Sequence, residues 1–483
     1  MQQRVPVSEQ RLSDWPRSAP VVAILLLALA LRVYRLADQS LWFDETLSWW
    51  VATTDIPGFL LPYGAYTPLY YFLIGAVSFL GKSEFLLRFA SVFFGVLSVV
   101  MIERVGRRVG GERVGLLAAL LLAINPFAIW FAQDARMYAM VPFFVLVAMD
   151  GFMRATEGRG WQRMIVGSAG AYFTHTISLF IVYVQLVWWL PRLKQQIGLF
   201  RRWALAQLAA AVPLILWEIW HFMQPVQGLA AVTWIPSPSV LAPALSLWNF
   251  VSGDTDTWTP LVLGMALIVG AVAVYGAWRT RQWRGFLLLW LLLPLVSALA
   301  LSWRVQIYVD RYFAYCQFPV LIFLAVGVMT IKRMPLRVMA GAAIVALMVV
   351  NVYRLHTDLL FAKENWREAA AIVNEQIQAG DRLGLQDEES LVAWQYYYHG
   401  AVTPSVIDPV KYPAALRDLR QGASRIWLVF RGPEVSNHRL GKPQTFDAYA
   451  AAAPVVQHWL AENCRPPSGE WRLPGLSVLL CKP

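Results

Sequence analysis

The sequence predicts an all-α polytopic membrane protein of about 11 transmembrane helices, followed by a small C-terminal α/β domain outside the membrane. Composition is the first observation, because 58% of the 483 residues are hydrophobic and only 15% are charged. The second is a mean hydropathy of +0.49. Such a chain cannot cover itself with a soluble surface. The third is a series of apolar runs, and a run of roughly 20 residues is needed to cross the hydrocarbon core of a bilayer.

Eleven of these runs are expected to span the membrane. They begin near Ala19, Phe85, Arg113, Met140, Met164, Ile177, Trp203, Thr259, Gly285, Phe313 and Leu336. Basic residues gather before the first run and in alternate connections, which places that side in the cytoplasm by the positive-inside rule. The N-terminus is therefore expected inside and the C-terminus outside. This arrangement also accounts for the net charge of +11 without a nucleic-acid partner.

The first outer loop, residues 38–84, is expected to carry two interfacial helices. The segment from Pro68 to Leu80 is apolar but too short to span comfortably, and counting it as a span would reverse every later loop. From Glu45 to Thr54, apolar side chains recur on one helical face, with tryptophans suited to the headgroup boundary. The domains are therefore predicted as a cytoplasmic tail (1–18), a transmembrane domain (19–354) whose N-terminal run is a signal anchor, and a soluble outer domain (355–483).

The outer domain begins where charged residues become frequent. The segment "ENWREAAAIVNEQI" predicts an amphipathic helix, and "SRIWLVF" and "LSVLL" predict strands. Two of the three cysteines, Cys464 and Cys481, lie in this domain. We expect them to form a disulfide bond because extracytoplasmic compartments are oxidising.

Two acidic residues stand at the apolar boundary on the predicted outer side. Asp44, followed by Glu45, opens the first outer loop, and Asp134 lies in the second. Each has a structural interpretation: Asp44 could cap the helix that follows, Glu45 could favour its positive end, and Asp134 could pair with Arg136. Ionisable groups at this depth are costly, however, so their occurrence in two separate loops on one face favours a functional site.

A carboxylate at such a site can accept the proton of an incoming hydroxyl while a lipid phosphate departs. The developing phosphate charge needs cations. The candidates at the outer boundary are Arg32, Arg136, Arg304 and Arg311. Each of these arginines could instead simply extend to the membrane interface.

Further residues are candidates to bind substrate or to support the site. Glu218 and His221 lie three residues apart near the outer end of a helix and could contact the acceptor or a metal, or could be a polar helix end. Tyr138, Tyr312, His175 and Glu45 complete the supporting set. A divalent cation, Mg²⁺ or Mn²⁺, is a candidate cofactor held through oxygen by Asp44 and Asp134.

Several segments together resemble the GT-C glycosyltransferases that use polyprenyl-phosphate sugars, a group that includes the dolichyl-phosphate-mannose protein mannosyltransferases and the lipid A aminoarabinose transferase. The resemblance covers roughly residues 19–332 and rests on "WFDE", "TPLYYFLIG", "SEFLLRFASVFFGVLSV", "NPFAIWFAQDARMYAM", "THTISLF" and "DRYFAYCQFP". It implies a catalytic base at Asp44, an assisting acid at Asp134 and a histidine that lines the site at His175. The aminoarabinose transferase has a lysine where this chain has Thr67, so an arginine must bind the phosphate here.

Together, the residues and the resemblance predict an inverting hexosyl- or pentosyltransferase in the cell membrane. It would move a sugar from a polyprenyl-monophosphate donor to a lipid, glycan or protein acceptor at the outer face. One alternative is a secondary transporter, although no span carries an acid or base at its middle and no duplicated halves are apparent. Another is a ligase or polymerase that uses lipid-linked glycans.

Overall fold

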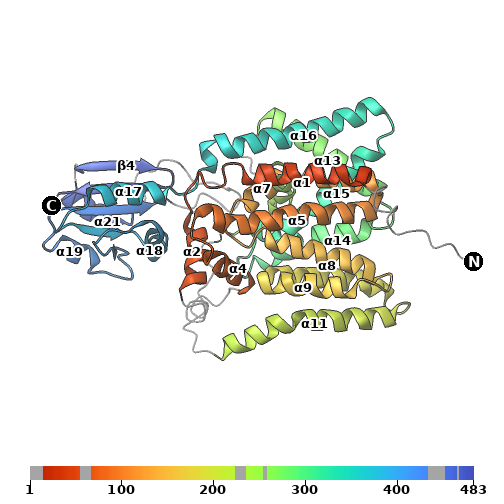
Figure 1. The fold of residues 1–483 in the computed structure, drawn as a ribbon, viewed down its shortest axis with the longest axis horizontal. Coiled ribbons are helices and arrows are strands. Elements are labelled where there is room, and N and C mark those ends of the chain that lie inside the picture. Colours follow the sequence, from red (N-terminus) through yellow and green to blue (C-terminus); the bar gives the residue numbers. More distant parts are fainter. Residues whose placement is uncertain are drawn as a thin grey trace, which may run out of the picture. The chain divides into compact units, whose positions relative to one another are not determined.

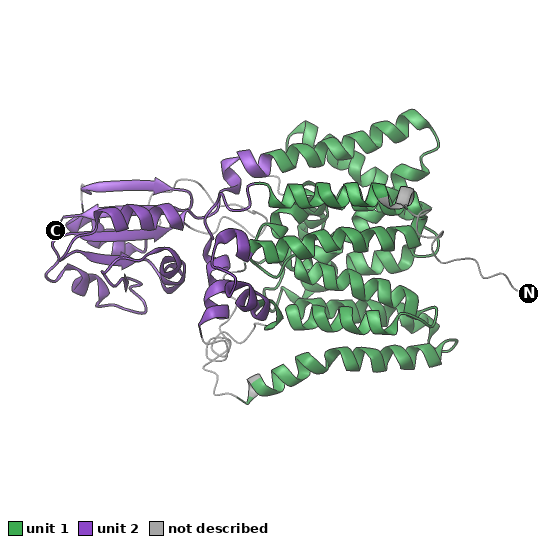
Figure 2. Ribbon diagram, viewed as in Figure 1, with its two compact units in different colours: residues 1–34, 60–70, 88–353 green, residues 35–59, 71–87, 354–483 purple. Residues whose placement is uncertain are grey.

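The computed structural model describes residues 15–54, 67–223, 235, 237–253, 258–432, 452–464 and 467–482 (Figure 1). The chain divides into two compact units (Figure 2). Unit 1 comprises residues 1–34, 60–70 and 88–353, and unit 2 comprises residues 35–59, 71–87 and 354–483. The predicted first outer loop therefore groups largely with the C-terminal segment. Most of the predicted cytoplasmic tail lies outside the described residues.

Unit 1 is a bundle of helices (Figure 1). The helices that lie wholly or largely in it are α1 (Trp15–Val33), α5 (Glu84–Gly110), α6 (Glu112–Ala123), α7 (Pro126–Ala132), α8 (Met140–Ala155), α9 (Trp161–Thr174), η1 (Thr176–Leu179), α10 (Phe180–Trp189), η2 (Leu190–Arg192), α11 (Ile197–Phe222), α12 (Ala242–Ser252), α13 (Pro260–Arg279), α14 (Arg284–Leu301), η3 (Asp310–Cys316), α15 (Gln317–Thr330) and α16 (Met334–Thr357). Every predicted span begins inside one of these helices or, for Thr259, at the N-cap of α13.

The helices of unit 1 have the composition of a multi-pass membrane protein. Among the described residues, six helical stretches are long and apolar enough to cross a bilayer, and a seventh is added if the bent pair α6–α7 is one span. The segments Ala19–Val33 and Thr176–Arg192 are apolar but shorter. The count of eleven spans and the N-inside orientation remain predictions.

A sharp break between α6 and α7 shapes the chain just before Asp134. The two helices meet at 58°. Pro126 begins α7, and a residue that precedes proline is disfavoured in the helical conformation, so α6 ends here. The Asn125 side chain accepts a hydrogen bond from Ala128 N at 2.8 Å and donates one to Phe250 O at 2.9 Å. The start of α7 is thereby both capped and tied to α12.

Glycines allow the helices of the bundle to approach closely. In the stretch Asp310–Thr330, which includes α15, 89% of an apolar 18-residue part is buried. A Cβ atom on Gly276 of α13 would lie 1.8 Å from Phe323 O, and one on Gly327 of α15 would lie 2.3 Å from Val272 O. No side chain fits between these backbones. This is the small-residue packing that holds helices together in lipid, where apolar surface alone gives no driving force.

Unit 2 contains a five-stranded sheet in the order β2-β1-β3-β5-β4. The strands are β1 (Arg382–Leu385), β2 (Ser405–Val406), β3 (Ile426–Arg431), β4 (Gly469–Leu473) and β5 (Leu476–Cys481). Strands β2, β1 and β3 run parallel, whereas β5 is antiparallel to both β3 and β4. The predicted strands "SRIWLVF" and "LSVLL" are confirmed as β3 and β5.

The sheet is covered on both faces because side chains alternate along β3. Trp427 and Val429 join one apolar cluster with α17 (Trp366–Gln376) and α18 (Glu388–Tyr397). Ile426 and Leu428 join another with α19 (Ala415–Arg420) and α21 (Pro454–Asn463). The predicted amphipathic helix is confirmed as α17, and the C-terminal segment is a small α/β fold.

Two further helices of unit 2 come from the first outer loop. They are α2 (Phe43–Thr53) and most of α4 (Leu69–Ser78), so both segments are helical as predicted, while their interfacial position on the outer side stays a prediction. A Cβ atom on Gly75 of α4 would lie 3.2 Å from Ala52 O of α2. Trp49 of α2 makes an edge-to-face ring contact with Tyr396 of α18, with centroids 4.9 Å apart. The loop helices therefore pack on each other and on the C-terminal fold.

The predicted disulfide bond is present. Cys464 follows α21, Cys481 ends β5, and their sulfur atoms are bonded. Both residues are buried in the cluster that covers one face of the sheet. The bond therefore fixes the end of α21 to that face.

We expect loss of this bond to destabilise the C-terminal fold. Replacing both cysteines by serine releases the 17-residue connection between them, which should lower the free energy of unfolding by ~2 to 3 kcal/mol. Thermal unfolding of the variant, compared with the wild type with and without reductant, measures the effect. Labelling of both thiols in the unreduced, denatured wild type would contradict the assignment.

Candidate active site

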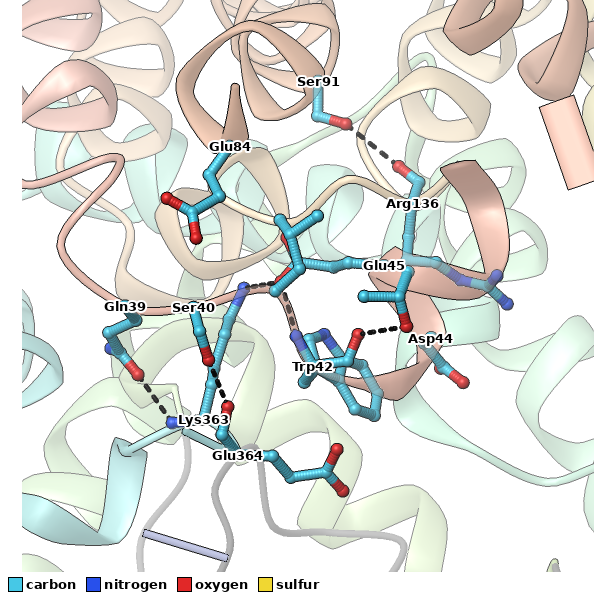
Figure 3. A network of polar contacts seen from close by, with 12 residues as sticks. Gln39, Ser40, Trp42, Asp44, Glu45, Glu84, Ser91, Arg136, Lys363 and Glu364 are labelled. Atoms are coloured by element: carbon cyan, nitrogen blue, oxygen red, sulfur yellow. Dashed lines mark hydrogen bonds and ion pairs between the residues drawn. The ribbon is translucent and has the colours of Figure 1, made fainter. Parts of the chain in front are cut away.

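The acid pair at the start of α2 separates into one half-buried and one fully buried carboxylate. Asp44 and Glu45 are the second and third residues of α2. Adjacent residues of a helix point about 100° apart, so the two cannot face the same site. Glu45 is fully buried, whereas Asp44 is partly exposed. In Figure 3 the Asp44 side chain points away from Lys363.

Glu45 is held at the helix start by two contacts. Its carboxylate accepts a hydrogen bond from Trp42 N at 3.3 Å, which satisfies one of the donors left open in the first turn. The same carboxylate lies 3.1 Å from Lys363 Nζ. These contacts fit the structural interpretation of Glu45, which leaves Asp44 as the acid of the pair that remains partly accessible.

The second acid, Asp134, lies in the short non-helical stretch between α7 and α8 and is 1% exposed. Its carbonyl accepts a hydrogen bond from Arg136 N at 2.7 Å. On either side, Gln133 Nε2 donates to Tyr34 O at 2.8 Å, and Ser91 Oγ donates to Arg136 O at 3.1 Å (Figure 3). The stretch that carries Asp134 is therefore fixed to α5 and to the end of α1.

Five of the predicted site residues come together in unit 1 from three separate segments. This cation–aromatic cluster consists of Arg136, Tyr138, His175, Arg311 and Tyr312. The Cζ atoms of Arg136 and Arg311 lie 5.8 Å and 5.6 Å from the centre of the Tyr138 ring. The Tyr312 ring lies 6.0 Å from that of Tyr138 and 5.0 Å from that of His175. Two guanidinium groups therefore lie against one tyrosine ring, and a histidine lies beside Tyr312.

The histidine of the cluster is oriented by the backbone that follows it. His175 Nδ1 accepts a hydrogen bond from Ile177 N at 3.2 Å. A neutral imidazole that accepts through Nδ1 carries its hydrogen on Nε2, so His175 is assigned as a donor at Nε2. A donor at this position adds to the hydrogen-bonding capacity of the two arginines.

A buried acid that was not among the predicted residues supports the cluster. Asp310, directly before Arg311, is 5% exposed. Its carboxylate accepts hydrogen bonds from Ser246 Oγ at 2.6 Å and Asn249 Nδ2 at 2.8 Å, both on α12. The sequence signal for Asp310 was its position next to Arg311 in "DRYFAYC". Its partners could not be identified from the sequence because Ser246 and Asn249 lie about 60 residues away. These bonds fix η3, and with it Arg311 and Tyr312.

Arg32 lies inside the bundle, where its guanidinium group donates hydrogen bonds to backbone carbonyls. It is 1% exposed and donates to Ala28 O, Leu122 O and Ala123 O at 2.9 to 3.1 Å. The carbonyls of Leu122 and Ala123 belong to the end of α6, which lacks helical donors there. Arg32 therefore caps a helix, and its role in binding the donor phosphate stays a prediction.

The remaining predicted residues do not join the cluster through any contact described here. Arg304 is exposed in the turn after α14, and Glu218 is exposed on α11. His221 lies near the end of α11, but its side chain is outside the described residues. Among the described residues, no three histidine, cysteine or acidic side chains gather in a group that could hold a metal ion. A divalent cation held by Asp44 and Asp134 stays a prediction.

No family model matches the sequence, and no curated protein matches it. Solved structures do match its fold. ArnT from Cupriavidus metallidurans bound to undecaprenyl phosphate is 13% identical, with a TM-score of 0.61 over 96% of this chain and 98% of that one. The Archaeoglobus fulgidus oligosaccharyltransferase in complex with zinc and sulfate is 12% identical, with a TM-score of 0.53 over 85% of this chain and 67% of that one.

A second structure of the archaeal enzyme, AglB in complex with an inhibitory peptide and a dolichol-phosphate, is 11% identical, with a TM-score of 0.50 over 84% of this chain and 69% of that one. The similarity to ArnT covers almost the whole of both chains, including the helical bundle and the C-terminal fold. At these identities the similarity concerns the fold. The chain has the GT-C fold of membrane glycosyltransferases.

Proposed function

We propose that this protein is an inverting glycosyltransferase that moves a sugar from a polyprenyl-monophosphate donor to an acceptor hydroxyl. The observation that carries the proposal is the convergence of Arg136 and Arg311 on the ring of Tyr138. Two cations that lie against the same ring can both contribute to binding an anion, and guanidinium groups match the oxygens of a phosphate. The lipid phosphates bound by ArnT and AglB, which share the fold, support this choice of donor.

The aromatic members of the cluster suit the other parts of such a donor. Tyrosine rings present apolar faces for a sugar or an isoprenoid chain, and their hydroxyl groups can donate to oxygen. His175 adds an N–H donor beside Tyr312. A donor with a charged phosphate, a polar sugar and an apolar tail matches this combination better than a soluble nucleotide sugar.

Asp44 is the proposed general base. It accepts the proton of the acceptor hydroxyl as that oxygen forms its bond to the anomeric carbon. The bond from this carbon to the phosphate oxygen breaks, and its electron pair leaves with the phosphate, whose charge Arg136 and Arg311 stabilise. Attack opposite the departing phosphate inverts the anomeric carbon. Asp134 assists as the second acid, and no step passes through a metal ion.

We further propose that the reaction takes place at the outer face of the cell membrane, with the C-terminal domain on the same side. The donor would be lipid-borne, and the acceptor would be a lipid, glycan or protein. The disulfide bond supports an oxidising compartment for unit 2.

The donor class is tested by turnover in detergent. We expect the purified chain to release polyprenyl monophosphate from a polyprenyl-monophosphate sugar in the presence of a suitable acceptor. Vesicles containing the protein should take up no free sugar. Uptake without lipid turnover would indicate a transporter, and turnover limited to lipid-pyrophosphate glycans would indicate a ligase or polymerase.

The two acids of the first outer loop should differ in their effect on the reaction. Asp44→Asn is expected to fold, to bind the donor and to lose ~10² to 10⁴ in transfer rate, because a positioned base is removed. Donor binding and single-turnover transfer measured on the same preparation separate these effects. If Asp44→Asn keeps nearly the wild-type rate while Asp134→Asn is inactive, the base is Asp134.

Arg311 is expected to bind the donor phosphate. Arg311→Ala should weaken donor binding by roughly 10- to 100-fold, which corresponds to the ~1.5 to 3 kcal/mol of a hydrogen bond to a charged group. Arg311→Lys should restore part of the affinity, since lysine keeps the charge but lacks the planar fork. Donor affinity is measured by titration, with Arg417→Ala, an exposed arginine on α19 outside the candidate set, as the control. Unchanged affinity in Arg311→Ala would shift the role to Arg304, Arg32 or Arg136.

A further inference from the structure

The pairing between Glu45 and Lys363 joins the start of α2 to the segment that leads into α17. Both side chains are withdrawn from water: the Glu45 carboxylate is 0% exposed and the Lys363 side chain is 7% exposed, with Nζ and Oε2 3.1 Å apart. Removing two charges from water is costly, and a single buried charge without its partner is more costly still. A buried pair of this kind therefore holds its two segments together strongly.

Neighbouring contacts connect the same two segments side by side (Figure 3). Lys363 N donates to Gln39 Oε1 at 2.6 Å, and Ser40 Oγ donates to Glu364 O. The Glu364 carboxylate accepts from Phe43 N at 3.0 Å and from Trp366 Nε1 at 2.7 Å. The first backbone N–H of α2 is thus capped by an acid from the C-terminal segment rather than by a local residue.

A second set of contacts holds the flanks of this junction. Arg367 binds both carboxylate oxygens of Glu84, at 3.0 and 2.5 Å. The Tyr397 hydroxyl accepts from Leu41 N at 2.6 Å and donates to Glu84 Oε1 at 2.7 Å. The chain that enters α2 is therefore hydrogen-bonded to α18, and α17 and α18 both bind Glu84 at the start of α5.

We propose that Lys363 is a positioning residue for the base: by holding Glu45, it fixes the first turn of α2 and the direction of the Asp44 carboxylate. The C-terminal domain then serves as the template on which the base helix is assembled. This inference rests on the proposed function, because Asp44 must be the base for its direction to matter. Lys363 itself takes no part in the transfer of protons or of the sugar.

The change Lys363→Met tests the inference because methionine fills similar space and removes the charge. The Glu45 carboxylate would then be buried without its partner and would move towards water, which displaces the first turn of α2. Glu45→Gln combined with Lys363→Met removes both charges and keeps an acceptor for Trp42 N. Lys363→Arg keeps the cation. Lys411→Met is the matched control, because Lys411 forms an exposed ion pair with Glu388 in the same unit.

Two measurements on the full-length protein in detergent are needed. Hydrogen exchange of the α2 amides should be at least about 10-fold faster in Lys363→Met, with β3 unchanged, because α2 then opens locally. The kcat for transfer should fall by about 10²-fold while the KM for the donor stays within about twofold. Displacing a catalytic group by ~1 Å has an effect of that size on the rate. The double variant and Lys363→Arg should recover part of both quantities, and Lys411→Met should match the wild type.

Unchanged exchange in α2 would overturn the inference, as would faster exchange combined with a wild-type kcat. If Lys363→Met does not fold, the double variant is measured instead. It should keep part of the faster exchange and part of the loss in kcat, and wild-type values of both would overturn the inference. Failure of the proposed function has a different signature. An Asp44→Asn variant that transfers sugar normally would overturn the assignment of the base and the catalytic part of this inference, while hydrogen exchange would still decide whether Lys363 anchors α2.

Discussion

The structure depends on one electrostatic constraint: a charged side chain withdrawn from water must be met by an opposite charge or by hydrogen bonds, because an isolated buried charge costs more than the net stability of a domain. The Arg32 guanidinium meets it with carbonyls at the end of α6. Asp150, which is fully buried on α8, forms ion pairs with three arginines, Arg108, Arg154 and Arg163. Glu45 meets it with Lys363. These contacts join segments that are far apart in the sequence, so they also determine how the helices are arranged.

The same constraint separates residues of one type into structural and chemical roles. Glu45 and Asp44 are neighbours, but Glu45 is committed to the helix start and to Lys363, whereas Asp44 is partly exposed. Arg32 and Arg311 were both candidates in the sequence, and of these two Arg311 lies over tyrosines of the cation–aromatic cluster. A buried ionisable group whose hydrogen-bonding atoms are mostly bound by its own fold has less capacity left for a ligand.

The components of the proposed reaction belong to different compact units. Unit 1 carries Asp134 and the cation–aromatic cluster, and unit 2 carries Asp44. Within unit 2, the helix that bears Asp44 is packed and hydrogen-bonded to the C-terminal α/β fold. A domain without an evident catalytic group of its own thus has a direct structural link to the proposed base.

The sequence by itself determined the positions of the helices, the α/β character of the C-terminal domain and the disulfide pairing. Periodicity and apolar length are properties of short segments, so they can be read without the fold. The disulfide pairing followed from the two cysteines of the C-terminal domain and the expectation of an oxidising compartment. The sequence also identified the five members of the cluster as candidates. Only the tertiary structure decided which candidates meet, that Arg32 caps α6, and which distant groups bind Asp310 and Lys363. Phe43 and Glu364 are 321 residues apart, and contacts of this kind depend on how helices and loops return to one another. No local pattern encodes the partner of a buried charge, because that partner is chosen by packing and by the cost of leaving the charge alone.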